Sequence, residues 1–114
     1  MDKWEVQLRK GSLELAIFAC LWAGRRYGLE ISRTLQRESN LDLSASTLYP
    51  LLARLKADVL LESEWVEAEA GHPRKYYRLT PHGRRRALEM ARTWMRFSSS
   101  LEHLVAPLLK ESVR

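Results

Sequence analysis

The sequence gathers hydrogen-bond donors into two short clusters, with one further basic residue between them. The first cluster is a run of hydroxyl side chains, and the second is a run of basic side chains beside a Gly and a Pro. The candidate contacts are Ser44, Ser46, Thr47, Tyr49, Arg54, His72, Arg74 and Lys75. Hydroxyl and cationic groups donate to phosphate oxygens and to the edges of bases, so this set indicates binding of a nucleic acid.

Several of these side chains also have a purely structural interpretation. Ser44 or Ser46 can cap a helix, Tyr49 can pack against a core, and an exposed Arg54 can simply be solvated. We favour DNA contact for Thr47 and Tyr49, whereas the two interpretations of Arg54 have equal weight. His72, Arg74 and Lys75 would by themselves be an ordinary basic turn. The helix that precedes them, with its hydroxyl residues, is what makes them candidates for nucleic-acid contact.

The composition favours a polyanionic partner and offers little for catalysis. Lysine and arginine number 19 against 14 aspartates and glutamates, which gives a formal charge of +5 and a pI of about 9.7. Basic residues that neutralise phosphates release condensed counterions. The three histidines lack the spacing of a metal site, and the single cysteine has no obvious neighbouring base. We therefore expect no catalytic residues, no cofactor and no metal.

The elements that must position these donors follow from hydrophobic periodicity and turn residues. The expected order is a helix at 12–24, a helix at 27–39, a helix from Ser44 or Ser46 to about residue 58, strands at 60–68 and 74–79, and a helix from Pro81. The loop between the strands spans 69–73. The sequence thus predicts three helices, a hairpin and a last helix within one continuous unit.

Four residues mark the expected helix boundaries. Ser12 is a favourable N-cap for the first helix, and Gly24 is a suitable stop. Thr80 can cap the last helix with Pro81 in its first position, although Gly83 weakens the first turn. Pro107 should kink or end that helix.

Apolar side chains of the last helix recur at alternating spacings of three and four residues. The seam consists of Met90, Trp94, Phe97, Leu101, Leu104 and Leu108. A 3.5-residue repeat is typical of helices that pack against a partner helix, and one chain cannot easily cover it. We therefore expect a homodimer. Trp94 has two interpretations, a large packed residue or a stacking platform for a flat ligand, and Trp4 can contribute to the same interface.

Neither a membrane span nor a secretion signal is expected. The longest apolar stretch, 13–23, is too short to cross a bilayer and contains Glu14. A single cysteine, Cys20, cannot form an intrachain disulfide and fits a reducing compartment. These features predict a cytoplasmic protein.

The order and spacing of several fragments resemble the PadR-like family of bacterial transcriptional regulators. The fragments are KGSLEL at 10–15, YGLEI at 27–31, STLYP at 46–50, RL at 54–55 and RKYYRLT at 74–80, followed by Gly83. The resemblance covers nearly the whole chain and points to the short-tailed branch of the family. Val59 stands where the family commonly has a glycine at the end of the third helix.

The resemblance implies a mainly α (α+β) fold, a winged helix-turn-helix domain with a C-terminal dimerisation helix. The third helix would be the recognition helix in the major groove, with the hairpin as a wing. The DNA-binding domain would span 1–80, its N-terminal helix contributing to the dimer, and the dimerisation helix would span 81–114. Some short-tailed relatives bind aromatic drugs between paired tryptophans, which makes Trp94 a candidate ligand residue.

Three functions are compatible with these observations. The favoured one is a homodimeric repressor that binds a pseudo-palindromic operator in double-stranded DNA. The second is an effector-sensing regulator, with a planar aromatic small molecule between the C-terminal helices. The third is a winged-helix adaptor that binds proteins and no DNA. Titration of tryptophan fluorescence separates the first two, and a sequence-selective DNA shift separates both from the third.

Overall fold

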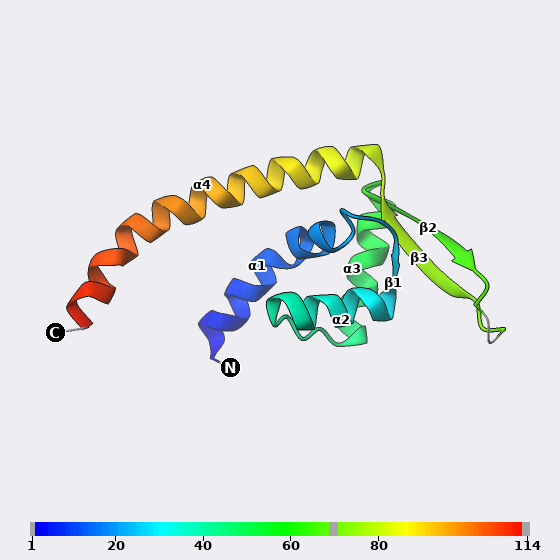
Figure 1. The fold of residues 1–114 in the computed structure, drawn as a ribbon, viewed down its shortest axis with the longest axis horizontal. Helices are drawn as coiled ribbons and strands as arrows, with labels where there is room; N and C mark the ends of the chain where they lie inside the picture. The colour runs from blue at the N-terminus through cyan, green and yellow to red at the C-terminus, as the bar shows by residue number, and fades with distance from the viewer. Residues whose placement is uncertain (1, 69–70, 113–114) are drawn as a thin grey trace.

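A computed structural model describes residues 2–68 and 71–112, which form a mainly helical chain with one small sheet. The elements are α1 (Lys3–Cys20), β1 (Arg26–Tyr27), α2 (Gly28–Ser39), α3 (Ala45–Ala57), β2 (Leu61–Val66), β3 (Arg74–Leu79) and α4 (Pro81–Ser112). Figure 1 shows α1, α2 and α3 grouped beside the sheet, with α4 running along one side of the group. The predicted order of three helices, a hairpin and a last helix is confirmed, with one strand added.

Helix α1 begins nine residues earlier than the sequence predicted. The Asp2 carboxylate accepts a hydrogen bond of 2.9 Å from the backbone N–H of Glu5 and so caps the first turn. Ser12 is therefore an interior residue, and its hydroxyl donates to the carbonyl oxygen of Leu8. The helix also ends at Cys20, so the interpretation of Gly24 as its stop is wrong. The first two turns escaped notice because their apolar residues do not face the core.

The hydrophobic core is built around the second half of α1. The largest side chains with less than 2 % of their surface exposed come from α1, its C-cap residue, α2, α3 and β2. They are Ile17, Phe18, Leu21, Ile31, Leu48, Leu52, Leu55 and Leu61. Cys20 is also buried, and burial raises the pKa of its thiol. One face from each of these elements is thus covered within the chain.

The sheet has three antiparallel strands in the order β1-β3-β2. The β2–β3 hairpin was predicted, with β3 at its observed bounds, whereas the two residues of β1 are too few for a periodic signal. In β2 the side chains of Leu61, Ser63 and Trp65 share a face, because side chains alternate along a strand. Leu61 on that face is almost fully buried, whereas Trp65 is 68 % exposed.

Helices α2 and α3 are each followed closely by a residue with a left-handed backbone conformation. Asn40 (φ 55°) ends α2, and Val59 (φ 59°) follows α3 by two residues. Asparagine adopts this conformation readily, whereas a β-branched residue is strained there. Val59 occupies the position at which the family resemblance leads one to expect glycine.

The start of α4 is held by Thr80 and Gly83. The Thr80 hydroxyl accepts from the N–H of Gly83 at 2.9 Å and donates to the carbonyl oxygen of Val59 at 2.6 Å. The predicted cap is therefore confirmed. Gly83 does more than weaken the first turn, because a Cβ there would lie 2.0 Å from the carbonyl oxygen of Leu60. Only glycine permits this close approach of α4 to the residue before β2.

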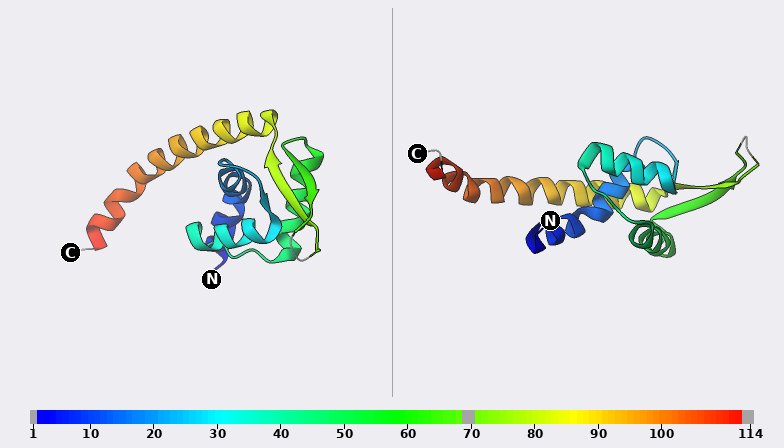
Figure 2. Two further views of the ribbon diagram at one scale, coloured as in Figure 1. Left: turned by 45° about the vertical axis from the view of Figure 1, so that its right-hand side comes forward. Right: turned by 90° about the horizontal axis from the view of Figure 1, so that it is seen from below.

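Helix α4 is 32 residues long and extends well beyond the rest of the molecule. Figure 1 shows it curving along its length, and in Figure 2 its far half and the β2–β3 hairpin project in opposite directions. Pro107 does not end the helix, which continues to Ser112. Among the helices of the described residues, none is long and apolar enough to cross a membrane.

Candidate nucleic-acid interface

The first turn of α3 carries a cluster of exposed hydroxyl groups. The Ser44 hydroxyl lies 2.9 Å from that of Ser46 and 3.1 Å from that of Thr47. Ser44 occupies the N-cap position, but its side chain makes no capping bond to the backbone. All three residues are exposed. The Ser44 hydroxyl therefore hydrogen-bonds to the other two hydroxyls at the start of the helix and does not cap the backbone. A hydroxyl can rotate to donate to a group outside the protein.

The basic residues of the hairpin are held over aromatic rings. The guanidinium of Arg74 lies 4.5 Å from the ring centroid of Tyr27, and the ammonium of Lys75 lies 5.8 Å from those of Trp65 and Tyr77. A cation over a ring face is attracted by the ring quadrupole but keeps its outer side open. These contacts position two positive charges in the groove between the sheet and α3.

His72 is exposed in the loop that joins β2 to β3. It lies near the end of the hairpin, two residues before Arg74. Part of the loop, residues 69–70, lies outside the described residues. His72 therefore adds a third potential donor to Arg74 and Lys75, but no hydrogen bond or ion pair with another described residue orients its side chain.

The opposite face of the sheet balances its own charges. Arg78 pairs with Glu62 at 2.7 Å and with Glu64 at 3.3 Å, and Arg25 pairs with Glu64 at 2.5 Å. The hydrogen bond that Arg78 donates to Glu62 raises the pKa of Arg78 further above its ordinary value. The carboxylates of Glu62 and Glu64 are therefore paired with arginines on the face of the sheet away from Lys75 and Trp65.

Tyr49 connects α3 to the start of α2. Its ring passes so close to Gly28 that a Cβ at this glycine would lie 2.5 Å from the Tyr49 hydroxyl oxygen. Tyr49 is still 47 % exposed. Burial raises the pKa of its neighbour Tyr77, which remains neutral and supplies an apolar floor. The hydroxyl end of Tyr49 is thus held against the start of α2, while about half of the residue stays exposed.

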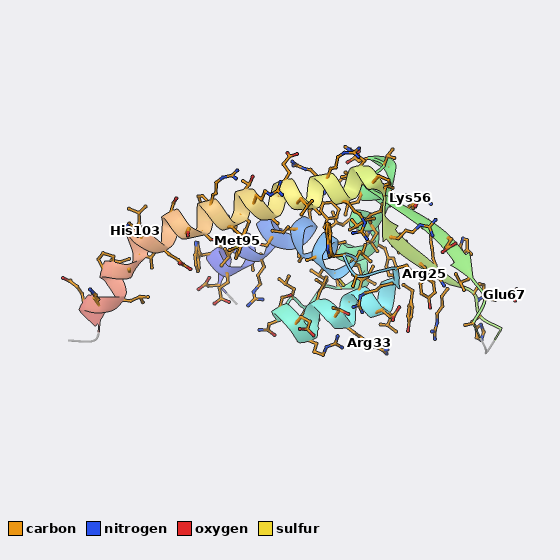
Figure 3. All side chains as sticks on the ribbon, turned by 45° about the horizontal axis from the view of Figure 1, so that its top comes forward. Arg25, Arg33, Lys56, Glu67, Met95 and His103 are labelled. Atoms are coloured by element: carbon orange, nitrogen blue, oxygen red, sulfur yellow. The ribbon has the colours of Figure 1, made fainter. Side chains whose placement is uncertain are left out.

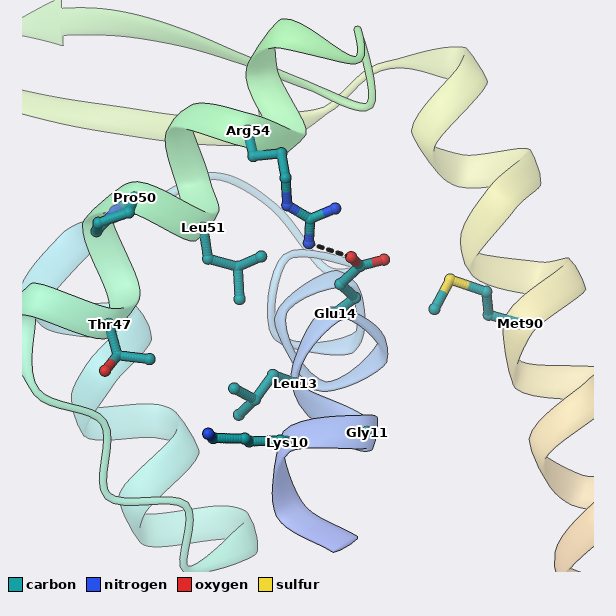
Figure 4. Close-up of a pocket in the computed structure, with 9 residues that line it drawn as sticks. All are labelled: Lys10, Gly11, Leu13, Glu14, Thr47, Pro50, Leu51, Arg54 and Met90. Carbon is teal, nitrogen blue, oxygen red and sulfur yellow. Dashed lines mark hydrogen bonds and ion pairs between the residues drawn. The ribbon is translucent and has the colours of Figure 1, made fainter. Parts of the chain in front are cut away.

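Arg54 lies apart from the other predicted contacts. Its guanidinium is hydrogen-bonded to the carboxylate of Glu14 on α1, and this bond raises the pKa of Arg54 above its ordinary value. The pair borders a cavity of about 670 Å³ between α1, α3 and α4, which Lys10, Thr47 and Met90 also line. Figure 4 shows Arg54 directed from α3 toward Glu14. Arg54 is therefore a candidate contact that has an internal partner.

The structure brings most of the predicted residues together in two groups. Ser44, Ser46 and Thr47 form one cluster, while Tyr49, Arg74 and Lys75 line one groove. Sequence reasoning missed the other aromatic residues of that groove, Tyr27, Trp65 and Tyr77. The only available signal was the alternation that placed Trp65 on the same face as Leu61.

The seam of α4 lies far from this groove. Met90 packs against the core, whereas the five residues that follow it in the seam are exposed to between 44 and 76 %. They are Trp94, Phe97, Leu101, Leu104 and Leu108. In Figure 3 the side chains near His103 stand clear of the rest of the molecule. Among the residues that the structure describes, no group of three or more His, Cys, Asp or Glu side chains can hold a metal ion.

Comparison with known proteins gives a consistent result. Residues 17–89 match the model of the transcriptional regulator PadR-like family. A protein from Lysinibacillus sphaericus without an assigned function is 30% identical over 87 residues, which cover 75% of this chain and 80% of its own.

Solved structures extend the similarity to the whole fold. A PadR-like transcription factor from Bacteroides fragilis is 41% identical, with a TM-score of 0.73 and coverage of 90% of this chain and 99% of its own. A PadR-like regulator from Bacillus cereus is 30% identical, with a TM-score of 0.80 and coverage of 87% and 96%. The family and these neighbours are transcriptional regulators and not enzymes.

Proposed function

The chain belongs to the PadR-like family of transcriptional regulators, and we propose that it acts in the cytoplasm as a homodimeric repressor on a pseudo-palindromic operator. Each subunit places the first turn of α3 in a major groove, with the β2–β3 hairpin as a wing beside it. The observation that carries this proposal is the groove that Tyr49 of α3 lines together with Arg74 and Lys75 of the hairpin, with a cluster of exposed hydroxyls at the start of the same helix. Residues 1–80 bind DNA and residues 81–114 join the subunits.

The contacts divide by chemistry. Ser46, Thr47 and Tyr49 contact base edges or the adjacent phosphates, since the N-terminal residues of a recognition helix enter the groove. His72, Arg74 and Lys75 contact the sugar–phosphate backbone of the DNA. Such contacts position the protein but do not distinguish one base sequence from another. Ser44 contributes through the hydroxyl cluster. Arg54 contributes only if it exchanges Glu14 for a phosphate.

Selection of bound duplexes from a random pool tests this proposal. A repressor dimer should select a consensus with two half-sites whose centres lie about 10 base pairs, or a multiple, apart, and footprinting should show the same spacing. Failure to enrich any sequence while a protein partner is bound would instead support the adaptor.

A double substitution of Arg74 and Lys75 by Ala tests the wing. It should weaken binding to all sequences and lower the salt slope by about one unit for each lost phosphate contact. The matched control removes two charges from α4, with Arg96 and Lys110 replaced by Ala, and should leave the slope unchanged. Equal slopes for both variants would remove the wing from the interface.

The exposed seam of α4 supports the dimer. Trp94, Phe97, Leu101, Leu104 and Leu108 form a continuous apolar stripe, and Trp4 and Leu8 of α1 are also exposed. Large exposed apolar stripes mark interfaces, and a two-fold axis lets the same stripe cover itself.

Leu101→Asp tests this dimer, because it places a charge in the stripe. Light scattering should then report a monomer. Ser99→Asp, which puts the same charge on the opposite side of the helix, should stay dimeric. A wild-type monomer at micromolar concentration would contradict the dimer.

The effector-sensing alternative has one observation in its favour. Trp94 is only half exposed and borders a cavity of about 320 Å³ beside Leu15, Met90 and Phe97. A planar aromatic compound there should quench tryptophan fluorescence in the wild type and less in Trp94→Ala. The titration is then repeated with operator present, because a ligand shifts the equilibrium only if it prefers one dimer geometry. Equal quenching in both proteins would leave Trp94 as a packing residue.

A further inference from the structure

The fold does not account for the exposure of Trp65. Trp65 lies on the same face of β2 as Leu61. The exposed fraction of Trp65 is 68 %, whereas that of Leu61 is 1 %. The face continues beyond the end of the core, in the groove between the sheet and α3. An indole contributes to stability by burial, and an exposed indole at this place forgoes most of that contribution. Most of the Trp65 indole is therefore free to contact a binding partner.

The surroundings of Trp65 combine aromatic rings with positive charge. The groove between α2, α3 and the hairpin has a volume of about 530 Å³. Its principal lining side chains are Tyr27, Tyr49, Trp65, Arg74, Lys75 and Tyr77. Among the described residues that line it, none carries a carboxylate. Glu62 and Glu64 of the same hairpin pair with arginines on the opposite face. The groove is thus shaped for a partner that is negatively charged and partly apolar.

Two contacts fix the relative positions of these groups. Lys75 is the direct antiparallel partner of Trp65, and its ammonium lies 5.8 Å from the centroid of the Trp65 ring. Tyr49 reaches the groove from α3 and is 47 % exposed. A charge, a hydroxyl and an apolar ring face therefore converge on one groove from two elements.

We propose that this groove holds one sugar–phosphate strand of the DNA, with the Trp65 ring packed on a deoxyribose and Lys75 and Tyr49 on the adjoining phosphate. The inference rests on the proposed function. When α3 lies in a major groove and the wing approaches the neighbouring minor groove, the backbone strand that separates the two grooves must pass between α3 and the wing. That strand alternates anions with apolar sugar faces, and the groove offers a partner for each. Trp65 is then an uncharged wing contact.

Salt dependence separates the two kinds of contact, because only neutralised phosphates release counterions. The duplex enriched in the selection experiment is titrated at several salt concentrations with the wild type, Trp65→Ala, Trp65→Phe and Lys75→Gln. Trp65→Ala should bind about tenfold more weakly at every salt concentration, with the wild-type slope. Trp65→Phe should recover most of the loss. Lys75→Gln should lower the slope by about one unit.

A second measurement does not depend on the alanine variant. DNA should protect part of the tryptophan fluorescence of the wild type from acrylamide, and this protection should shrink in Trp65→Phe. Unchanged affinity in Trp65→Ala and equal protection in both proteins would overturn the inference while leaving the regulator intact. Failure of the wild type to bind any duplex would overturn both the inference and the proposed function. A loss in Trp65→Ala with a reduced salt slope would also overturn the inference, because it would show that Trp65 acts only by positioning Lys75.

Discussion

The same residue types have opposite environments in two regions of this molecule. In the winged body, residues 3–80, Phe18 and Leu52 are fully buried. In the α4 stripe, formed by Trp94, Phe97, Leu101, Leu104 and Leu108, Phe97 is 66 % exposed and Leu104 is 76 % exposed. A large apolar side chain gains stability only when another surface covers it, and no other part of the described residues covers most of the stripe.

The difference has a physical origin in the number of elements that meet. Phe18 lies on α1, with α2 and α4 packed against that helix. Helix α4 contacts α1 and β3, and its far half extends away from the body. A helix of this length with a 3.5-residue repeat presents a seam to another helix. The body should therefore be stable alone, while the stripe should be ordered by association.

Paired truncation of two phenylalanines should give the largest contrast. Phe18→Ala should lower the free energy of unfolding by about 3–5 kcal/mol, because it leaves a cavity in a fully packed core. Phe97→Ala should instead weaken the dimer. Thermal unfolding at two protein concentrations distinguishes a less stable core from a weaker dimer, because the melting temperature of a dimer rises with protein concentration.

The outcome for Phe97 decides whether the two regions differ as described. Phe18→Ala should lower the melting temperature by a similar amount at both concentrations. Phe97→Ala should reduce the dependence on concentration. A loss at Phe97 as large and as independent of concentration as that at Phe18 would show that the stripe is packed within one chain.

Gly83 joins the two regions and should show the next largest effect. A Cβ at this position would meet the carbonyl oxygen of Leu60 at 2.0 Å, so Gly83→Ala must displace α4 from the body. We expect a loss of about 1–3 kcal/mol in the free energy of unfolding by urea. Gly24→Ala is the control, because a Cβ there has no atom within 4 Å. Similar stability for both variants would mean that α4 and the body are not tightly joined.

The elements that sequence predicted well are those whose signals are local. Thr80 and Pro81 marked the start of α4 because capping depends on residues within one turn. The hairpin followed from alternation and from Gly71 with Pro73. By contrast, β1 has two residues and exists only because it pairs with β3, so no periodicity announces it.

The candidate site was predictable in its residue types but not in its contacts. Hydroxyls at the start of α3 and cations in the hairpin are visible in the sequence. The pairing of Arg54 with Glu14 joins residues 40 positions apart, and the contact of Arg74 with Tyr27 joins residues even further apart in the sequence. Such contacts depend on the packing of whole elements, which a single sequence does not display. The same limit explains why the role of Gly83 was missed.

Val59 offers a smaller change, within the body alone. Its left-handed backbone (φ 59°) costs a residue with a Cβ about 1–2 kcal/mol, and its side chain is 62 % exposed, so little packing is lost on removal. Val59→Gly should raise the free energy of unfolding by about 1 kcal/mol, since glycine offsets part of the relief by its own entropy. Asn40→Gly should gain less, because asparagine tolerates φ 55°. A decrease in Val59→Gly would show that its side chain stabilises the turn.

The ion pair between Arg54 and Glu14 should give the smallest effect, and it tests how far the body prepares α3 for DNA. Both side chains are partly exposed, so the pair adds little to stability. If Arg54 exchanges Glu14 for a phosphate, Glu14→Gln should tighten operator binding about two- to fivefold, because the guanidinium no longer has to leave a carboxylate. Loss of the Glu14 charge also reduces general repulsion of DNA, so the substitution is repeated in an Arg54→Ala background. A gain that falls in this background identifies Arg54 as a phosphate contact, whereas the same gain in both assigns Arg54 to holding α3 against α1.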